Sequence, residues 1–187
     1  MTRCTKLCAA FLGLVLSLLL LCSCQRASAP LILPETNGTS PSQWKAQLIA
    51  ALNEQQRSFE LSEPYIQDTD TNAEAVLHYI QQQTNSGSAK VTELLSEGPD
   101  GFVSCAPALE ELLHPSDDET CSVSYAPLPA DALTSQNTDL TDTARTLIRN
   151  QKLITYSDTF SPKNCEKVSL AAGNIGGQLY VLVVFSS

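Results

Sequence analysis

Apolar residues recur every three or four positions in several stretches of the chain, which is the spacing of helices that turn one face towards a core. The first stretch contains Trp44 and Leu48 and predicts a helix that Ser40 caps and that runs to about Arg57. The second stretch begins with Thr71-Asn72-Ala73-Glu74, and this spacing predicts a capping box at the start of a second helix.

Shorter patterns follow in the middle of the chain. The leucines of residues 109–113 predict a third helix, which Pro115 ends. Residues 140–151 have helical spacing again and predict a fourth helix. Residues 122–126 alternate in the manner of a strand, and residues 153–156 are expected to be extended.

The last twenty residues carry the clearest strand pattern. Residues 168–172 predict one strand, the glycine-containing segment 173–177 predicts a tight turn, and residues 179–185 predict a second strand. The second strand is apolar on both faces, which is typical of a strand packed between two layers. Helices followed by a buried antiparallel hairpin predict a single layered α+β domain over residues 43–187.

The N-terminus differs from the rest because it is almost purely apolar. Arg3 and Lys6 are its only charges, and an apolar run over residues 7–24 follows them. A short positive segment before about a dozen apolar residues is the layout of a secretory signal peptide, here residues 1–23. The alternative is a retained membrane anchor, for which the run is short.

The end of this apolar run predicts a lipid anchor. Leu21-Cys22-Ser23-Cys24 resembles the bacterial lipobox, and the resemblance implies a lipoprotein whose Cys24 carries acyl chains such as palmitate. Residues 24–42 would then be the lipidated cysteine and a flexible tether, and the domain would be held at the extracytoplasmic face of the cell membrane. The alternative is cleavage after Ala29, within an A-x-A sequence, which would give a secreted protein.

Composition narrows the class of partner. The chain has 187 residues, with 11 Lys+Arg against 20 Asp+Glu and a formal net charge of −9, so nucleic acid is not expected to bind. A hydrophobic content of 43% argues against wholesale disorder. The acidic run Asp117-Asp118-Glu119 predicts a solvated loop and, as an alternative, a contact for a cation or a basic partner.

The cysteines after the signal region predict one disulfide bond and one remaining thiol. Cys105, Cys121 and Cys165 are candidates, and the sequence allows both the Cys105–Cys121 and the Cys121–Cys165 pairing. An extracytoplasmic location favours oxidation. No pair of them has a C-x-x-C spacing, so no zinc site is expected.

Only weak candidates for catalysis are present. Glu74 and His78 lie four residues apart on the predicted second helix, a spacing at which they could exchange a proton. His114, at the end of the third helix, is explained by the helix dipole. Residues 68–72 spell the first half of a calcium loop without its glycine or its later glutamate, so no metal and no cofactor are expected.

The order of these segments resembles the CAP superfamily of secreted, SCP-like domains. Three segments carry the resemblance, which spans about residues 44–187: Leu48 to Arg57, Pro64-Tyr65 followed by Ala75 to Ile80, and Val168 to Phe185. The resemblance implies an α-β-α sandwich in a degenerate form. It carries over no cleft residue, because the two histidines of this chain do not stand in the motifs of the family.

The sequence therefore predicts a membrane-anchored extracytoplasmic lipoprotein. Its domain is expected to bind a cell-wall, peptide or protein ligand without catalysis. The alternative is a secreted hydrolase that acts on wall or peptide material through His78 and Glu74.

Overall fold

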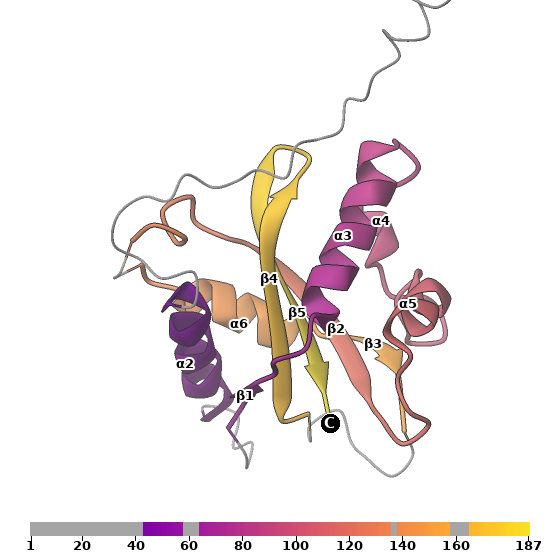
Figure 1. The fold of residues 1–187 in the computed structure, drawn as a ribbon, viewed down its shortest axis with the longest axis horizontal. Coiled ribbons are helices and arrows are strands. Elements are labelled where there is room, and N and C mark those ends of the chain that lie inside the picture. The colour runs from indigo at the N-terminus through magenta and orange to yellow at the C-terminus, as the bar shows by residue number, and fades with distance from the viewer. Residues whose placement is uncertain (1–42, 58–63, 136–137, 158–164) are drawn as a thin grey trace, which may run out of the picture. The chain divides into compact units, whose positions relative to one another are not determined.

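The computed structural model describes residues 43–57, 64–135, 138–157 and 165–187. Four predictions lie outside these residues: the signal peptide 1–23, the lipidated Cys24, the tether 24–42 and the helix cap at Ser40. The described residues form the following elements, labelled as in Figure 1: α2 (Gln43–Arg57), β1 (Ile66–Gln67), α3 (Asn72–Asn85), α4 (Val91–Leu94), α5 (Ala106–Leu113), β2 (Cys121–Pro127), α6 (Thr141–Arg149), β3 (Lys152–Thr155), β4 (Lys167–Ile175) and β5 (Gln178–Ser186).

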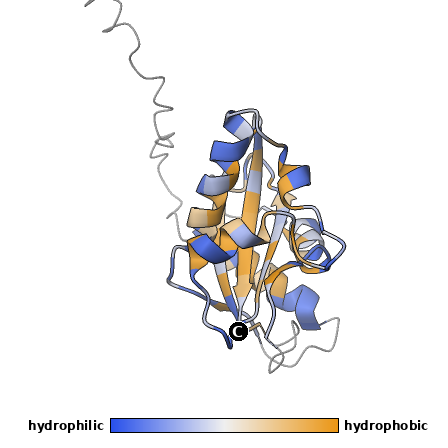
Figure 2. Ribbon diagram, turned by 90° about the vertical axis from the view of Figure 1, so that its right-hand side faces the viewer, coloured by the Kyte–Doolittle hydropathy of each residue, from blue (hydrophilic) through white to orange (hydrophobic). Residues whose placement is uncertain are grey.

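A five-stranded mixed sheet lies between two layers of helices. The strand order is β1-β4-β5-β2-β3, in which β1 runs parallel to β4 and the other neighbours are antiparallel. Helices α2 and α6 cover one face, and α3, α4 and α5 cover the other (Figures 1 and 2). The predicted α+β class and α-β-α layering are confirmed.

Alternate side chains of β5 point into two hydrophobic cores, one on each face of the sheet. Val181, Val183 and Phe185 point to the core under α2 and α6, whereas Leu182 and Val184 point to the core under α3 and α5. All five are at most 1% exposed. The strand is apolar on both faces because each face meets a helical layer, as the sequence predicted.

The turn of the C-terminal hairpin is shorter than predicted. Residues 173–175 belong to β4, and only Gly176 and Gly177, with φ of 61° and 86°, form the turn. Two positive φ values suit the two-residue hairpin turn that matches the twist of its strands. Gly173 instead lets α3 pack closely on β4, because a Cβ atom at this position would lie 2.9 Å from Cδ2 of Leu77.

The start of α3 is not stabilised by the predicted capping box. Thr71 makes no side-chain hydrogen bond to the helix, and the Glu74 side chain accepts a hydrogen bond from Lys45 on α2. Instead, the backbone N–H of Ala73 donates to Oγ of Ser169 on β4 at 3.0 Å. The sheet therefore caps this helix, and this fixes where α3 stands over β4.

Strand β1, which the sequence analysis did not predict, is held from two sides. It pairs with Lys167 and Val168 of β4. Just before it, Asn53 of α2 accepts the N–H of Tyr65 with Oδ1 at 2.6 Å and donates to the Tyr65 carbonyl from Nδ2 at 3.2 Å. The chain between α2 and α3 is thereby tied to the edge of the sheet.

Candidate functional site

A groove about 310 Å³ in volume lies between α2 and α3, with β4 as its floor. We call it the α2–α3 groove. It contains both residues that the sequence suggested for proton transfer, Glu74 and His78. The lining residues are Trp44, Lys45, Glu74, Leu77, His78, Gln81, Ala171 and Ala172.

Small residues on β4 make this space. Ala171 and Ala172 lie under the groove, and Gly173 follows them. Leu77 fills the far side by packing against Gly173, and Gln81 Nε2 donates to the carbonyl of Asn174 at 3.1 Å. Larger side chains at these strand positions would occupy the hollow between the two helices.

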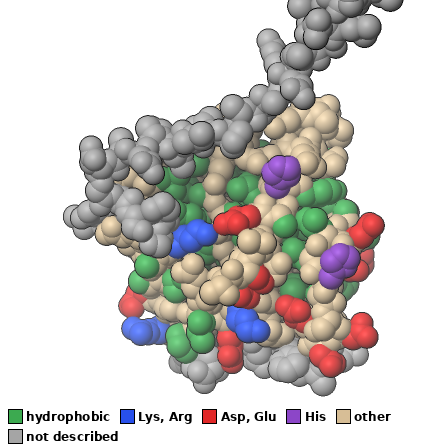
Figure 3. Space-filling model, viewed as in Figure 1, with side chains coloured by type: hydrophobic (Ala, Val, Ile, Leu, Met, Phe, Trp, Pro, Cys, Tyr) green, Lys and Arg blue, Asp and Glu red, His purple; other side chains and the backbone are tan. Residues whose placement is uncertain are grey.

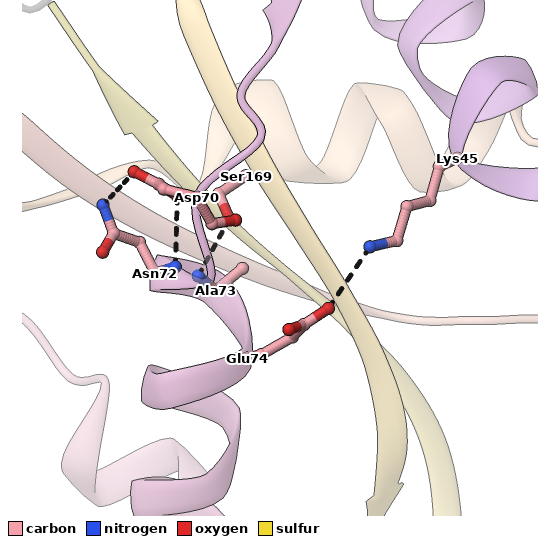
Figure 4. A network of polar contacts seen from close by, with 6 residues as sticks. All are labelled: Lys45, Asp70, Asn72, Ala73, Glu74 and Ser169. Atoms are coloured by element: carbon pink, nitrogen blue, oxygen red, sulfur yellow. Dashed lines mark hydrogen bonds and ion pairs between the residues drawn. The ribbon is translucent and has the colours of Figure 1, made fainter. Parts of the chain in front are cut away.

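Two opposite charges meet across the groove. The Nζ atom of Lys45 on α2 lies 3.4 Å from Oε1 of Glu74 on α3, and Figure 4 shows the two side chains reaching towards each other. The side chains are 24% and 56% exposed, so solvent reaches both. The Lys45 ammonium also lies 5.9 Å from the centre of the Trp44 ring.

A polar network at the start of α3 fixes the position of Glu74 (Figure 4). Ser169 accepts the N–H of Ala73 and donates its hydroxyl to the carbonyl of Asp70 at 3.3 Å. Asp70 accepts the N–H of Asn72 with Oδ1 at 3.1 Å. The first turn of α3 is thus held by a sheet residue and by its own preceding loop, and the Glu74 carboxylate projects from this turn.

The structure gives His78 and Glu74 separate partners. Nδ1 of the exposed His78 lies 3.1 Å from Nε2 of Gln82, one turn further along α3. Glu74 pairs with Lys45 instead. The groove therefore places a histidine beside an ion pair, and it can offer an ammonium, a carboxylate and an imidazole to one ligand.

The other histidine lies apart from this groove. His114 is exposed and ends α5 in the left-handed conformation, with φ of 49°. Figure 3 shows the histidine side chains as separate patches at the surface. The two histidines do not form one site.

The half calcium loop folds as turns. Asp68 accepts the backbone N–H of Asp70, and Asp70 accepts that of Asn72. The two carboxylates therefore bind local backbone and serve the entry to α3. Within the described ranges, no group of three or more His, Cys, Asp or Glu side chains is placed to hold a metal ion.

The candidate disulfide cysteines are three buried thiols. Burial raises the pKa of Cys105 to about 11, that of Cys121 to about 12 and that of Cys165 to about 11. The carboxylate of Glu119 contributes to the raised pKa of both Cys121 and Cys165. Such thiols are weak nucleophiles at neutral pH. Which two of them pair under oxidising conditions stays a prediction.

Sequence reasoning missed two contributors to this groove. Lys45 stands in the predicted first helix, but its partner is 29 residues away and no local spacing connects them. The alanines of β4 looked like ordinary strand residues. The run Ala171-Ala172-Gly173 was the available signal, because successive strand residues point to opposite faces, and small residues on both faces leave space beside the strand for the two helices that flank it.

Comparisons with known proteins add no relative. In the part of the chain that the structure describes, no helix is long and apolar enough to cross a bilayer. The sequence matches no model of a known protein family, and it matches no curated protein and no solved structure. The resemblance to the CAP superfamily therefore stays a prediction made from the residues named above.

Proposed function

We propose that this protein is a lipid-anchored, extracytoplasmic binding module with a degenerate CAP-like domain. Cys24 carries the lipid, and residues 25–42 separate the domain from the membrane. The α2–α3 groove binds a ligand of the cell wall, a peptide or a protein without converting it. The lipobox-like sequence supports the anchor, and the geometry of the groove supports the binding role.

The observation that carries the binding role is the exposed pair of Lys45 and Glu74. An exposed ion pair contributes little to stability, about 0–1 kcal/mol, so a ligand can separate it at low cost. A ligand with an ammonium and a carboxylate group can bind both partners through charge-assisted hydrogen bonds. Peptides and the peptide stems of cell walls have both groups.

Binding without turnover fits the surroundings of His78. General acid–base catalysis by histidine gains from a group that orients the ring within hydrogen-bond distance. The observed neighbour of Nδ1 is the neutral amide of Gln82, and the Glu74 carboxylate is engaged with Lys45. A secreted hydrolase that uses His78 and Glu74 is the competing function, and activity lost on His78→Ala would establish it.

Metabolic labelling with palmitate tests the anchor. In a bacterial host the full chain is expected to incorporate the label, and Cys24→Ala is expected to abolish incorporation. Cys22→Ala is the matched control and should keep the label. Label that persists in Cys24→Ala, or a wild-type chain that is never labelled, contradicts lipidation at Cys24.

Calorimetry with a wall stem peptide that has a free amino group and a free carboxylate tests the groove. Glu74→Gln and Lys45→Met are expected to weaken binding about tenfold each, because each removes one charge that the ligand meets. Glu54→Gln is the control, since Glu54 pairs with Arg57 on the outer side of α2. Equal affinities in all four proteins would place the ligand elsewhere.

A further inference from the structure

A second groove runs beside α4 and α5. Of the helices and strands that line it, α3 alone also lines the α2–α3 groove. It consists of two adjoining hollows of about 370 and 380 Å³, which share Ser104 and Pro107. We call it the α4–α5 groove. It lies within the size range of sites that bind small molecules and peptide side chains.

Apolar side chains line this groove without being fully buried. Tyr79 and Leu94 contribute to one hollow, Phe102 to the other, and Pro107 to both. Leu112 lies one helical turn after Ala108 on α5 and is 40% exposed, which is unusual for a leucine in this fold. The groove and this side of α5 therefore offer apolar surface to a partner.

Carboxylates surround the apolar surface. Glu93 lines one hollow, and Asp100 and Glu110 line the other. Figure 3 shows acidic side chains on the side of the molecule where α5 lies, with hydrophobic surface between them. From residue 91 to residue 119 the chain has eight acidic residues and no Lys or Arg; they are Glu93, Glu97, Asp100, Glu110, Glu111, Asp117, Asp118 and Glu119.

Lys90 precedes this stretch of the chain, but the carboxylates of residues 91–119 take part in no ion pair among the described residues. The ion pairs among the described residues join Lys45 to Glu74, Arg57 to Glu54 and Arg145 to Asp142. None of them includes a carboxylate of residues 91–119. A groove walled by unpaired charges of one sign raises the local concentration of ligands of the opposite sign.

We infer that the α4–α5 groove binds a basic segment of a protein partner, with an apolar side chain in the hollows and Lys or Arg side chains at Glu93, Asp100 and Glu110. A partner with positive charge alone would leave the contact surface of Tyr79 and Leu94 exposed to water. A purely apolar partner would bury the carboxylates without counterions. The inference extends the proposed role as a binding module to a second surface and a partner of stated chemistry.

A fluorescent peptide tests the inference. The probe is a twelve-residue peptide with alternating Lys and Leu. Fluorescence anisotropy measures its affinity for the full chain in mild detergent at about 0.15 M salt, where charges more than about 8 Å apart are largely screened. Binding is expected to weaken at least tenfold in the triple variant Glu93→Gln, Asp100→Asn, Glu110→Gln. Asn and Gln keep the acceptors that cap Lys90 N–H and Phe102 N–H, so this variant should fold.

Matched controls separate a specific groove from general attraction. The triple variant Glu54→Gln, Asp142→Asn, Glu166→Gln removes the same charge elsewhere and should bind the peptide within about twofold of the wild type. A peptide with Ser in place of Leu should bind at least tenfold more weakly than the probe. Equal losses in both triple variants, or equal affinity for both peptides, would overturn the inference.

The same probe distinguishes this inference from the proposed function. Glu74→Gln, which weakens the wall stem peptide at the α2–α3 groove, should leave binding of the Lys-Leu peptide unchanged. Loss of the Lys-Leu peptide in Glu74→Gln would place the basic segment in the α2–α3 groove and overturn the second site. If the stem peptide does not bind but the Lys-Leu peptide does, the proposed function is contradicted and the inferred site in the α4–α5 groove is not.

Discussion

Lys45 on α2 and Glu74 on α3 form an ion pair of 3.4 Å between two helices that cover opposite faces of the sheet. Helix α2 packs with α6, whereas α3 packs with α4 and α5. The pair therefore bridges the side of β4 that its two-residue pairing with β1 leaves open beyond Val168, next to the small residues Ala171 and Ala172. A charged contact at a sheet edge stands in solvent, where a ligand can reach both of its partners.

This position predicts a separation of stability from binding. Lys45→Met should change the free energy of unfolding by less than about 1 kcal/mol, because the pair is exposed and the stem of the side chain is kept. The same variant should weaken the stem peptide about tenfold. Urea unfolding followed by tryptophan fluorescence, together with calorimetry, measures the two effects. A large loss of stability without loss of binding would make the pair structural.

The cap of α3 provides a second prediction. Ser169→Ala removes the acceptor for the Ala73 N–H and should destabilise the fold by about 1–2 kcal/mol. Thr71→Ala is the control, because Thr71 makes no side-chain bond to the helix, and it should cost less than about 0.5 kcal/mol. Urea unfolding of both variants decides between the sheet and the loop as the cap. A loss of unfolding free energy in Thr71→Ala equal to that in Ser169→Ala would contradict Ser169 as the cap of α3.

The two hydrogen bonds between the Asn53 side chain and the Tyr65 backbone provide a third prediction. Asn53→Ala should cost about 2 kcal/mol, because it leaves the backbone groups at a part-buried position without partners. Asn53→Asp keeps the acceptor and loses the donor, so its cost should be intermediate. The exposed Asn85→Ala serves as the reference. An Asn53→Ala variant as stable as Asn85→Ala would show that β1 is held by its pairing with β4 alone.

The buried thiols predict how stability depends on pH. In reducing buffer, an unfolded cysteine ionises near its ordinary pKa of about 8.5, whereas folded Cys121 keeps its proton up to about pH 12. Unfolding free energy should therefore be level below about pH 8.5 and fall above it, by at least about 2 kcal/mol at pH 10.5 from the three thiols together.

A variant with Ala at Cys105, Cys121 and Cys165 is the control for this pH dependence. It should lose most of the fall above pH 8.5 and keep only the part that comes from buried tyrosines such as Tyr65, whose pKa is also raised by burial. Urea unfolding at several pH values measures both proteins. The same slope in the variant and in the wild type would contradict ionisation of the thiols as the cause.

The layers were predictable because their signals are local. Strand β5 is apolar on both faces, and this pattern alone requires a layer on each side. The helical spacing of α2, α3, α5 and α6 was also readable from neighbouring residues. Strand β1 was missed because it has two exposed residues, and its pairing with β4 lies about a hundred residues away in the chain.

The candidate site was half predictable for the same reason. Glu74 and His78 were found because they are four residues apart on one helix. Lys45 and Ser169 were not, since their contacts with α3 bridge 29 and 96 residues. Lys45 takes the Glu74 carboxylate that local spacing had assigned to His78, and His78 is left beside Gln82 on its own helix, so the predicted proton-transfer pair is an ion pair and a separate histidine.

Binding without turnover is the central claim, and one experiment on insoluble cell wall tests it most directly. The full chain in mild detergent is incubated with purified wall, and the bound protein and the soluble wall fragments are measured in the same tube. We expect saturable binding that Glu74→Gln weakens about tenfold. Neither the wild type nor His78→Ala should release soluble wall fragments. Fragments released by the wild type and not by His78→Ala would contradict the claim and establish a hydrolase.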